Sequence, residues 1–488
     1  MNSSIIRYIL GNVMRMEACF LLLPCIVSLV YGEGVGLYYL GTAIVCLAFG
    51  MVMAWKKPKN YVFYLKEGCI ATSLSWIVMS LVGCMPFWIS GEIPSFTDAM
   101  FETVSGFTTT GASILTNVEA LSHTALFWRS FTHWIGGMGV LVFLLAIIPL
   151  SGGSNINLMR AESPGPSVGK LVPKMKYTAR ILYIIYFGMT ILEFIFLIIG
   201  KMPVFDSICT AVGTAGTGFG VKNDSLGSYS PYLQWVVAIF MILFGVNFNA
   251  YYYIIYRHFK KAFKMEEVRC YFAIILIAAA IIFANILDRC VSIFDALTKS
   301  VFQVASLITS TGFSSTDFNL WPQICRTVLV LIMFIGACAG STGGGIKVSR
   351  VIVLFKTMIK ELHSYIHPKS IRKVNLDGKP VEHEIVRSIN VYIVTFVIIF
   401  ASSVFMVAFD GKDLVTNFTA VLTTINNMGP GLAEVGPTGN FSNFSVFSKF
   451  VFMFDMLAGR LELFPLLILF HPSAWKDLIS KRAEARKF

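Results

Sequence analysis

The sequence predicts an all-α polytopic membrane protein in which two N-terminal spans precede four repeats of span, pore half-helix, filter loop and span around a pseudo-fourfold pore. Three observations predict this fold. The 488 residues are 56% hydrophobic and 14% charged, with a mean hydropathy of +0.72, whereas soluble domains carry about 25% charged residues. Apolar stretches long enough to cross ~30 Å of hydrocarbon recur along the chain. Four polar turns, each centred on a glycine, interrupt them at intervals of roughly a hundred residues.

The apolar stretches give the expected spans in chain order. They cover residues 8–31, 36–55, 68–90, 125–149, 179–200, 232–256, 268–288, 323–340, 385–409 and 446–470. The first two form an extra pair, and each repeat takes two of the others. We therefore expect five units, which are the N-terminal pair 1–60, the pore repeats 61–160, 161–262 and 263–365, and the fourth repeat with its cytoplasmic tail, 366–488.

Positive charge orients these spans, because Lys and Arg collect in the short cytoplasmic loops of membrane proteins. Here they concentrate at the N-terminus and in residues 56–66, 160–180, 257–269, 347–387 and 476–487. Both termini are therefore expected in the cytoplasm, and the net charge of +12 indicates topology rather than a nucleic-acid partner. The opposite side carries acids that would attract a cation, namely Glu92, Asp98, Glu102, Glu119, Asp206, Asp224, Asp317 and Glu434.

No catalytic site or bound cofactor is predicted. The ten cysteines lack the C-x-x-C spacing of a zinc site, and the seven histidines are scattered, mostly near loops or span ends. The pattern therefore gives no indication of an enzyme.

The four polar turns define the repeats. They are Thr108 to Ala112, Ala215 to Phe219, Thr309 to Phe313 and Asn426 to Pro430. Irregular backbone is tolerated at bilayer depth only where it is buried in protein or lines an aqueous cavity, since lipid offers its N–H and C=O groups no partner. Four such turns in one chain therefore indicate four quarters of one pore.

An acidic residue opens a short apolar helix before each turn. A helix of the intervening length, at ~1.5 Å per residue, reaches about halfway into the membrane. An Asp suits its positive N-terminus and supplies a cap. The C-terminal end then directs partial negative charge at the pore centre, which favours a cation. The four acids are Asp98, Asp206, Asp295 and Asp413.

One glycine stands at the centre of each turn. Glycine accepts positive φ, so neighbouring carbonyls can face one axis, and a ring of carbonyls can replace the hydration shell of a potassium ion. Glycines that pack helices in small-xxx-small fashion are the alternative. The candidate ligands of the bound and transported K⁺ are Thr110, Gly111, Thr217, Gly218, Thr311, Gly312, Met428 and Gly429. The second turn contains an additional Gly216, so its register is open by about two residues.

The segment from Gly336 to Lys347 interrupts the span after the third turn with five glycines, so a continuous helix is not expected there. A phosphate-binding loop needs Gly-Lys-Ser/Thr in sequence, whereas Ile346 separates Gly345 from Lys347. A gate below the filter and a passive kink remain as interpretations. The candidate gate residues are Gly340, Gly343, Gly344, Gly345 and Lys347.

Arg460 lies within the last apolar stretch. A cation at bilayer depth costs at least ~2.5 to 3.5 kcal/mol on insertion scales and commonly has a function. A functional role is one interpretation, and an internal ion pair with Glu462 or another acid, or snorkelling to the interface, is the alternative.

The strings TTTGAS, TSTGFSS and NNMGPGL, together with WRSFTHWIGGMGVLVF, GACAGSTGGGIKVSR and MLAGRLELFPLLILF, resemble the Trk/Ktr/HKT superfamily of potassium transporters. The resemblance covers essentially the whole chain, and the extra N-terminal pair is most similar to the TrkH branch. It implies that the filter glycines are Gly111, Gly218, Gly312 and Gly429. It also implies that Arg460 faces the pore near the glycine-rich gate and forms a barrier to ions.

The same resemblance implies potassium uptake across a bacterial inner membrane, a homodimer in lipid and a cytosolic nucleotide-binding ring similar to TrkA. A sodium-selective pore is disfavoured because Gly111 stands where the sodium-preferring branch has serine. A secondary symporter coupled to H⁺ or Na⁺ is the alternative from another class. Inverted repeats would support such a carrier, but these four repeats share one orientation.

Overall fold

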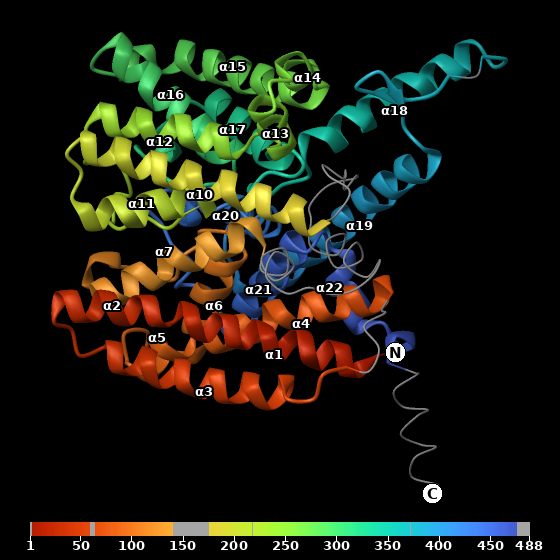
Figure 1. Cartoon of the computed structure of the whole chain (residues 1–488). Helices are drawn as coiled ribbons and strands as arrows, with labels where there is room; N and C mark the ends of the chain where they lie inside the picture. Colours follow the sequence, from red (N-terminus) through yellow and green to blue (C-terminus); the bar gives the residue numbers. More distant parts are fainter. Residues whose placement is uncertain (1, 59–63, 140–174, 217, 371, 476–488) are drawn as a thin grey trace, which may run out of the picture.

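The computed structural model describes residues 2–58, 64–139, 175–216, 218–370 and 372–475. The N-terminal pair and the first repeat are helical (Figure 1). Their helices are α1 (Ser3–Phe20), α2 (Leu22–Tyr31), α3 (Gly36–Ala54), α4 (Leu65–Gly83), α5 (Met85–Ile89), α6 (Phe96–Phe107) and α7 (His123–Met138). The second repeat comprises α10 (Met175–Ile199), α11 (Val204–Gly216), α12 (Pro231–Phe244), α13 (Phe248–Ile255) and α14 (Phe259–Lys264).

The third and fourth repeats follow the same order. Their helices are α15 (Glu266–Ile286), α16 (Ile293–Ile308), α17 (Gln323–Ile335), α18 (Val348–Ile366), α19 (His383–Val407), α20 (Leu414–Ile425), α21 (Val446–Arg460) and α22 (Phe464–Phe470). Strands β1 (Asn375–Leu376) and β2 (Lys379–Pro380) pair antiparallel in a hairpin between α18 and α19. Within the described residues, six helical segments are long and apolar enough to cross a membrane, and the bent pair α12 and α13 gives a seventh.

The four repeats close into a ring. The pore helices α6, α11, α16 and α20 each contact the second span of a neighbouring repeat, in the pairs α21 with α6, α7 with α11, α12 with α16 and α17 with α20. Repeat one therefore meets repeat four as well as repeat two. The fold is the predicted one, with α1 to α3 along one edge of the ring (Figure 1).

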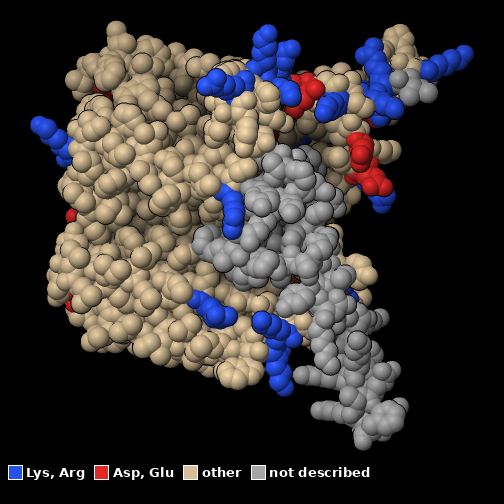
Figure 2. Space-filling model, viewed as in Figure 1, with Lys and Arg blue, Asp and Glu red and all other residues tan. Residues whose placement is uncertain are grey.

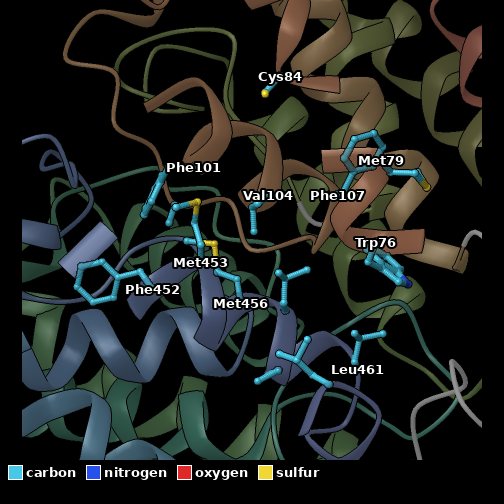
Figure 3. Packing of buried hydrophobic residues seen from close by; sticks show 14 of the residues in the cluster. Trp76, Met79, Cys84, Phe101, Val104, Phe107, Phe452, Met453, Met456 and Leu461 are labelled. Atoms are coloured by element: carbon cyan, nitrogen blue, oxygen red, sulfur yellow. The ribbon is translucent and has the colours of Figure 1, made fainter. Parts of the chain in front are cut away.

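One buried apolar cluster seals the junction of the first and last repeats. Figure 3 shows Phe101, Val104 and Phe107 of α6 in one cluster with Trp76 of α4 and Met456 of α21. Burying such large side chains is worth about 1.5 to 3 kcal/mol each in water, whereas in lipid close packing carries the association. This junction holds pore helix α6 at a fixed distance from the fourth repeat.

The second spans of repeats one, two and four differ from the prediction, which treated these stretches as continuous. In repeat three, the stretch 323–340 is helical only to Ile335, where the glycine-rich segment was expected to interrupt it. The stretch 232–256 bends by 92° between α12 and α13. The stretch 446–470 breaks at Glu462 and Leu463, which have φ of 58° and 65°. In 125–149, helix α7 ends at Met138, and residues 140–149 lie outside the described residues. Apolar composition alone does not reveal these breaks, because the freed backbone groups are satisfied inside the protein.

The pore helices are capped partly by serine rather than by the predicted aspartates. Ser95 and Ser292 accept from the backbone N–H groups of Asp98 and Asp295, at 3.3 and 3.1 Å. The two aspartates lie in the first turn, where they still suit the helix dipole. Asp413 is itself an N-cap and accepts from Thr416 N at 3.1 Å. The hydrogen bond from the Thr416 hydroxyl lowers the pKa of the Asp413 carboxyl.

Candidate functional site

The four filter glycines meet at one place. A Cβ added to Gly111 would lie 3.5 Å from Gly429 Cα and 3.6 Å from Gly218 O, and one added to Gly429 would lie 3.4 Å from Gly312 Cα. These residues are far apart in the sequence, and the pore helices α6, α11, α16 and α20 deliver them to the centre of the ring. The predicted positions are therefore brought together by the fold.

The turns share an unusual backbone geometry. Gly111 and Gly312 have φ of 80° and 82°, and Thr109, Ser310 and Asn427, each two residues before a filter glycine, have φ between 53° and 60°. L-residues rarely adopt this region, so the turns are held by their surroundings. Thr309 Oγ1 lies 2.7 Å from Thr311 Oγ1, and the corresponding Thr108 and Thr110 hydroxyls are 2.9 Å apart. Side-chain hydrogen bonds thus stabilise the strained turns.

The second turn is in register at Gly218. Its N–H donates to Thr311 O at 2.8 Å, which places Gly218 beside the third turn. The additional Gly216 occupies the position of Thr109 and Ser310, and a Cβ there would collide with His133 O at 2.1 Å. Thr217 lies outside the described residues. The side chain of Met428 is fully buried in an apolar cluster, so only its backbone can face an ion.

A cavity of about 430 Å³ opens above the turns, and all four filter glycines line it. Its other lining residues come from the loops that follow the turns, including Ser113, Asn223, Asp224 and Ser314. Carbonyl, hydroxyl, amide and carboxylate oxygens are ligands suited to a hard cation. The cavity therefore forms a vestibule from which a hydrated ion can reach the four glycines.

The glycine-rich segment of residues 336–347 lies directly below the turns. Gly344 N donates to Ser310 Oγ at 2.6 Å, and a Cβ on Gly344 would lie 2.1 Å from Asn426 O. A Cβ on Gly343 would lie 2.7 Å from Thr309 O. The absence of side chains at these two glycines allows this close approach. The segment is thus packed against the filter turns of repeats three and four.

A buried carboxylate fixes this segment to the second and third repeats. Glu267 of α15, which is 5% exposed, accepts from Ala339 N at 2.6 Å and from Ser349 N at 3.2 Å. The Asn247 amide, at the bend between α12 and α13, donates to the same carboxylate at 3.0 Å. Gly340 O accepts from Phe248 N at 3.1 Å. Glu267 therefore joins Ala339 within the segment, Ser349 at the start of α18 and the α12–α13 bend.

Of the two cationic side chains predicted to belong to the gate, Lys347 ends this segment and Arg460 lies beside it. Lys347 is 2% exposed, and its ammonium donates to Gly343 O. Arg460 donates to the carbonyls of Gly136, of Gly137 at 3.1 Å and of Thr342 at 3.4 Å. Arg460 thus connects the end of α7 to the glycine-rich segment.

The predicted alternative partner of Arg460, Glu462, forms an ion pair with Arg350. Arg350 lies in the first turn of α18, immediately after the glycine-rich segment. The guanidinium carbon of Arg460 lies 5.7 Å from the centroid of the Trp76 ring. Two arginines therefore bind the last span to its neighbours. Arg460 connects it to the glycine-rich segment, and Arg350 connects Glu462 to the start of α18.

Sequence reasoning missed a buried ion pair behind the filter. Arg129 Nε of α7 lies 2.6 Å from Glu102 Oε1 of α6, and their side chains are 4% and 0% exposed. Charged groups at bilayer depth are candidates for function. Applied to the expected span 125–149, this criterion would have singled out Arg129.

Known proteins resemble this chain in both sequence and structure. A family model described as TrkH, a cation transport protein, matches residues 39–477. The chain belongs to this family. The family is one of transporters, and its description names no enzymatic activity.

Members of the TrkH family are similar to this chain over almost their whole length. The Trk system potassium uptake protein TrkH of Salmonella typhimurium is 34% identical over 484 residues, which are 97% of this chain and 99% of the relative. The protein of the same name from Escherichia coli is 33% identical with the same coverage. TrkG of Escherichia coli is 31% identical over 491 residues, 98% of this chain and 100% of the relative.

A solved structure of the TrkH family has the same fold. The crystal structure of the potassium transporter TrkH from Vibrio parahaemolyticus matches with a TM-score of 0.87 at 29% identity, and the match covers 97% of this chain and 100% of that chain. The likeness therefore includes the N-terminal pair as well as the four pore repeats.

Proposed function

We propose that this chain takes up potassium ions through the pore that its four repeats enclose. The observation that carries this proposal is the convergence of Gly111, Gly218, Gly312 and Gly429 beneath one vestibule. Backbone carbonyls arranged around an axis can replace the hydration shell of K⁺. Potassium uptake by the named relatives supports the choice of ion.

The glycine-rich segment and Arg460 form the gate in this proposal. Gly343 and Gly344 pack below the turns, so an ion leaving the filter toward the interior meets this segment. Arg460 binds the Thr342 carbonyl and adds a positive charge near the ion path. Opening requires the segment to move away from Ser310 and Asn426.

The orientation and the partners belong to the same proposal. Most of the Lys and Arg visible on the face in Figure 2 lie on the side of the N-terminus and α18. The positive-inside rule places this side in the cytoplasm of a bacterial cell. A second copy of the chain and a cytosolic nucleotide-binding subunit similar to TrkA complete the proposed assembly, with the basic inner loops as the docking surface.

Flux measurements on the purified chain in liposomes test this function. Potassium and sodium gradients are imposed separately, each with and without a proton gradient. We expect flux that follows the potassium gradient and favours K⁺ over Na⁺. Uphill potassium movement driven by a proton or sodium gradient would instead identify a coupled symporter, and absence of a potassium preference would contradict the proposal.

A further inference from the structure

We infer that Glu102 and Arg129 are positioning residues that fix the spacing of two filter turns and thereby set the preference for potassium over sodium. The inference rests on the proposed function. Neither side chain touches the ion in this account, because both act through the backbone of the loops that follow Gly111 and Gly218.

The burial of this pair calls for an explanation beyond stability. Glu102 is 1% exposed and Arg129 is 3% exposed. Removing two charges from water costs several kcal/mol for each ion, and a buried ion pair is often no more stabilising than apolar residues of the same volume. The contacts of the pair indicate instead that it fixes the conformation of the groups around it.

Glu102 holds the first filter loop. One carboxylate oxygen accepts from Ser113 Oγ at 3.0 Å, and the other accepts from Ile114 N at 3.0 Å. These two residues lie two and three positions after Gly111 along the extended chain. The carboxylate is thereby bonded to both the side chain and the backbone of the segment leaving the filter.

Arg129 reaches across to the second repeat. Its Nη1 donates to Gly220 O at 3.0 Å, and its guanidinium carbon lies 3.5 Å from the centroid of the Phe219 ring. Phe219 and Gly220 are the first and second residues after Gly218, so Gly220 corresponds to Ser113 in the first repeat. Since Arg129 also pairs with Glu102, one charged unit sets the separation of two loops at the level of the filter.

Hydrogen bonds between neutral groups join the other neighbouring repeats at this level, with one longer contact to a charge, from Thr438 Oγ1 to Asp317 Oδ2 at 3.5 Å. Leu226 N donates to Ser314 O at 2.9 Å between repeats two and three, and Phe441 N donates to Ser113 O at 2.8 Å between repeats four and one. Between repeats three and four, Ala433 N donates to Asn319 Oδ1 at 2.9 Å. The residues at the position of Glu102 relative to the filter glycine are Cys209, Gln303 and Ala420. Among these four positions, only that of repeat one is charged.

Selectivity follows from the stiffness of these contacts. A filter prefers K⁺ when the number and separation of its carbonyls match the larger ion, whether through size or through field strength. Charge-assisted hydrogen bonds are about twice as strong as neutral ones. Loss of the pair therefore lets the first two loops move, so that the carbonyls can close on the smaller sodium ion.

The test uses the full chain in liposomes and three variants, Glu102→Gln, Arg129→Gln and the double substitution. Reversal potentials under opposing K⁺ and Na⁺ gradients give the permeability ratio, and thermal unfolding is measured on the same preparation. We expect each variant to lower the ratio about tenfold, and the double variant to resemble either single one because the two residues act as a unit. Lys299→Gln is the control, since Lys299 pairs at 2.7 Å with Asp295 on pore helix α16. It should keep the wild-type ratio.

The double variant decides the inference even where a single variant fails to fold, because it leaves no buried charge unpaired. A wild-type ratio in a folded double variant would overturn the inference and leave the proposed function intact. Reduced stability with an unchanged ratio would likewise overturn it, since the pair would then be merely structural. A wild-type protein without potassium preference would contradict the proposed function, and the inference would fall with it.

Discussion

The outer and inner halves of the pore differ in how closely the four repeats agree. In the outer half, the turns of repeats one, three and four share a left-handed residue two positions before the glycine. In the inner half, one second span bends by 92°, another continues into the glycine-rich segment and a third ends at Arg460. In the proposed function, equivalent geometry is needed where the repeats share one ion. In the same proposal a single segment closes the passage, and the departure from symmetry coincides with that segment.

Among the substitutions proposed here, removing the charge of Arg460 in the inner half should change ion uptake the most. At an effective dielectric constant of ~20, a unit charge about 6 Å from a permeating ion contributes roughly 3 kcal/mol, or about 100-fold in rate. Arg460→Ala should therefore raise rubidium uptake by up to about 100-fold before screening is counted.

Arg460→Lys separates charge from hydrogen bonding. Lysine keeps the positive charge but lacks the planar fork that reaches Gly136, Gly137 and Thr342. Slow uptake by this variant would assign the effect to charge, and fast uptake by both variants would assign it to the loss of the tie. Reduced stability of Arg460→Ala without faster uptake would contradict the barrier.

Displacing the glycine-rich segment should have the next largest effect. Gly344→Ala puts a methyl group 2.1 Å from Asn426 O, so the segment must move away from the filter. We expect rubidium uptake to rise about tenfold, in proportion to ~1.4 kcal/mol of lost packing. Gly188→Ala, in α10 with no atom within 4 Å of the new Cβ, is the matched control. Equal or lower uptake by a folded Gly344→Ala protein would favour a passive kink.

Gly111→Ser probes the outer half. The added Cβ meets no atom closer than 3.5 Å, so space is sufficient. The φ of 80° nevertheless costs a non-glycine residue roughly 1 to 2 kcal/mol, and the turn should relax. We expect the K⁺/Na⁺ permeability ratio from reversal potentials to fall about tenfold.

Gly41→Ser, in α3 with no atom within 4 Å of the new Cβ, provides the comparison for Gly111→Ser. Its permeability ratio should equal that of the wild type. An unchanged ratio in Gly111→Ser itself would remove Gly111 from the filter.

The outer half of the pore could be predicted from the sequence because its signals are local and repeated. Each polar turn follows an apolar helix with an acid near its start, and four copies in register define a ring. The caps Ser95 and Ser292 were missed because Asp98 and Asp295 follow them by three residues, and aspartate is preferred at N-caps as strongly as serine.

The inner half could be predicted only in part, since its structure depends on distant partners. The glycine content of residues 336–347 indicated an interruption, but its anchor Glu267 lies about 70 residues earlier. The breaks at the ends of α12 and α21 leave an apolar composition unchanged. Glu102 and Arg129 are likewise distant in sequence, and only the fold reveals that they join two filter loops.

A substitution of Glu33, at the outer surface and away from the ion path, should have the smallest effect. Glu33 accepts from His123 N at 2.8 Å, Thr124 N at 3.0 Å and Thr124 Oγ1 at 2.6 Å, so it caps α7. Partial burial raises the pKa of Glu33, but the hydrogen bonds from Thr124 and His123 outweigh it, and the pKa lies below its ordinary value of 4.5. The ionised carboxylate is therefore the form that stabilises the folded protein.

A group with a lowered folded pKa contributes stability that is present above its unfolded pKa and is lost as the pH falls through the folded value. Glu33→Gln should therefore lower the thermal unfolding temperature by about 2 °C at pH 7, as expected for a cap worth ~1 kcal/mol. The difference from wild type should shrink as the pH falls below 4.5 through the lowered pKa of Glu33. A difference that persists in full at pH 3 would show that ionisation is not its cause. A changed K⁺/Na⁺ ratio in this variant would contradict the division between a scaffold at the surface and the filter it surrounds.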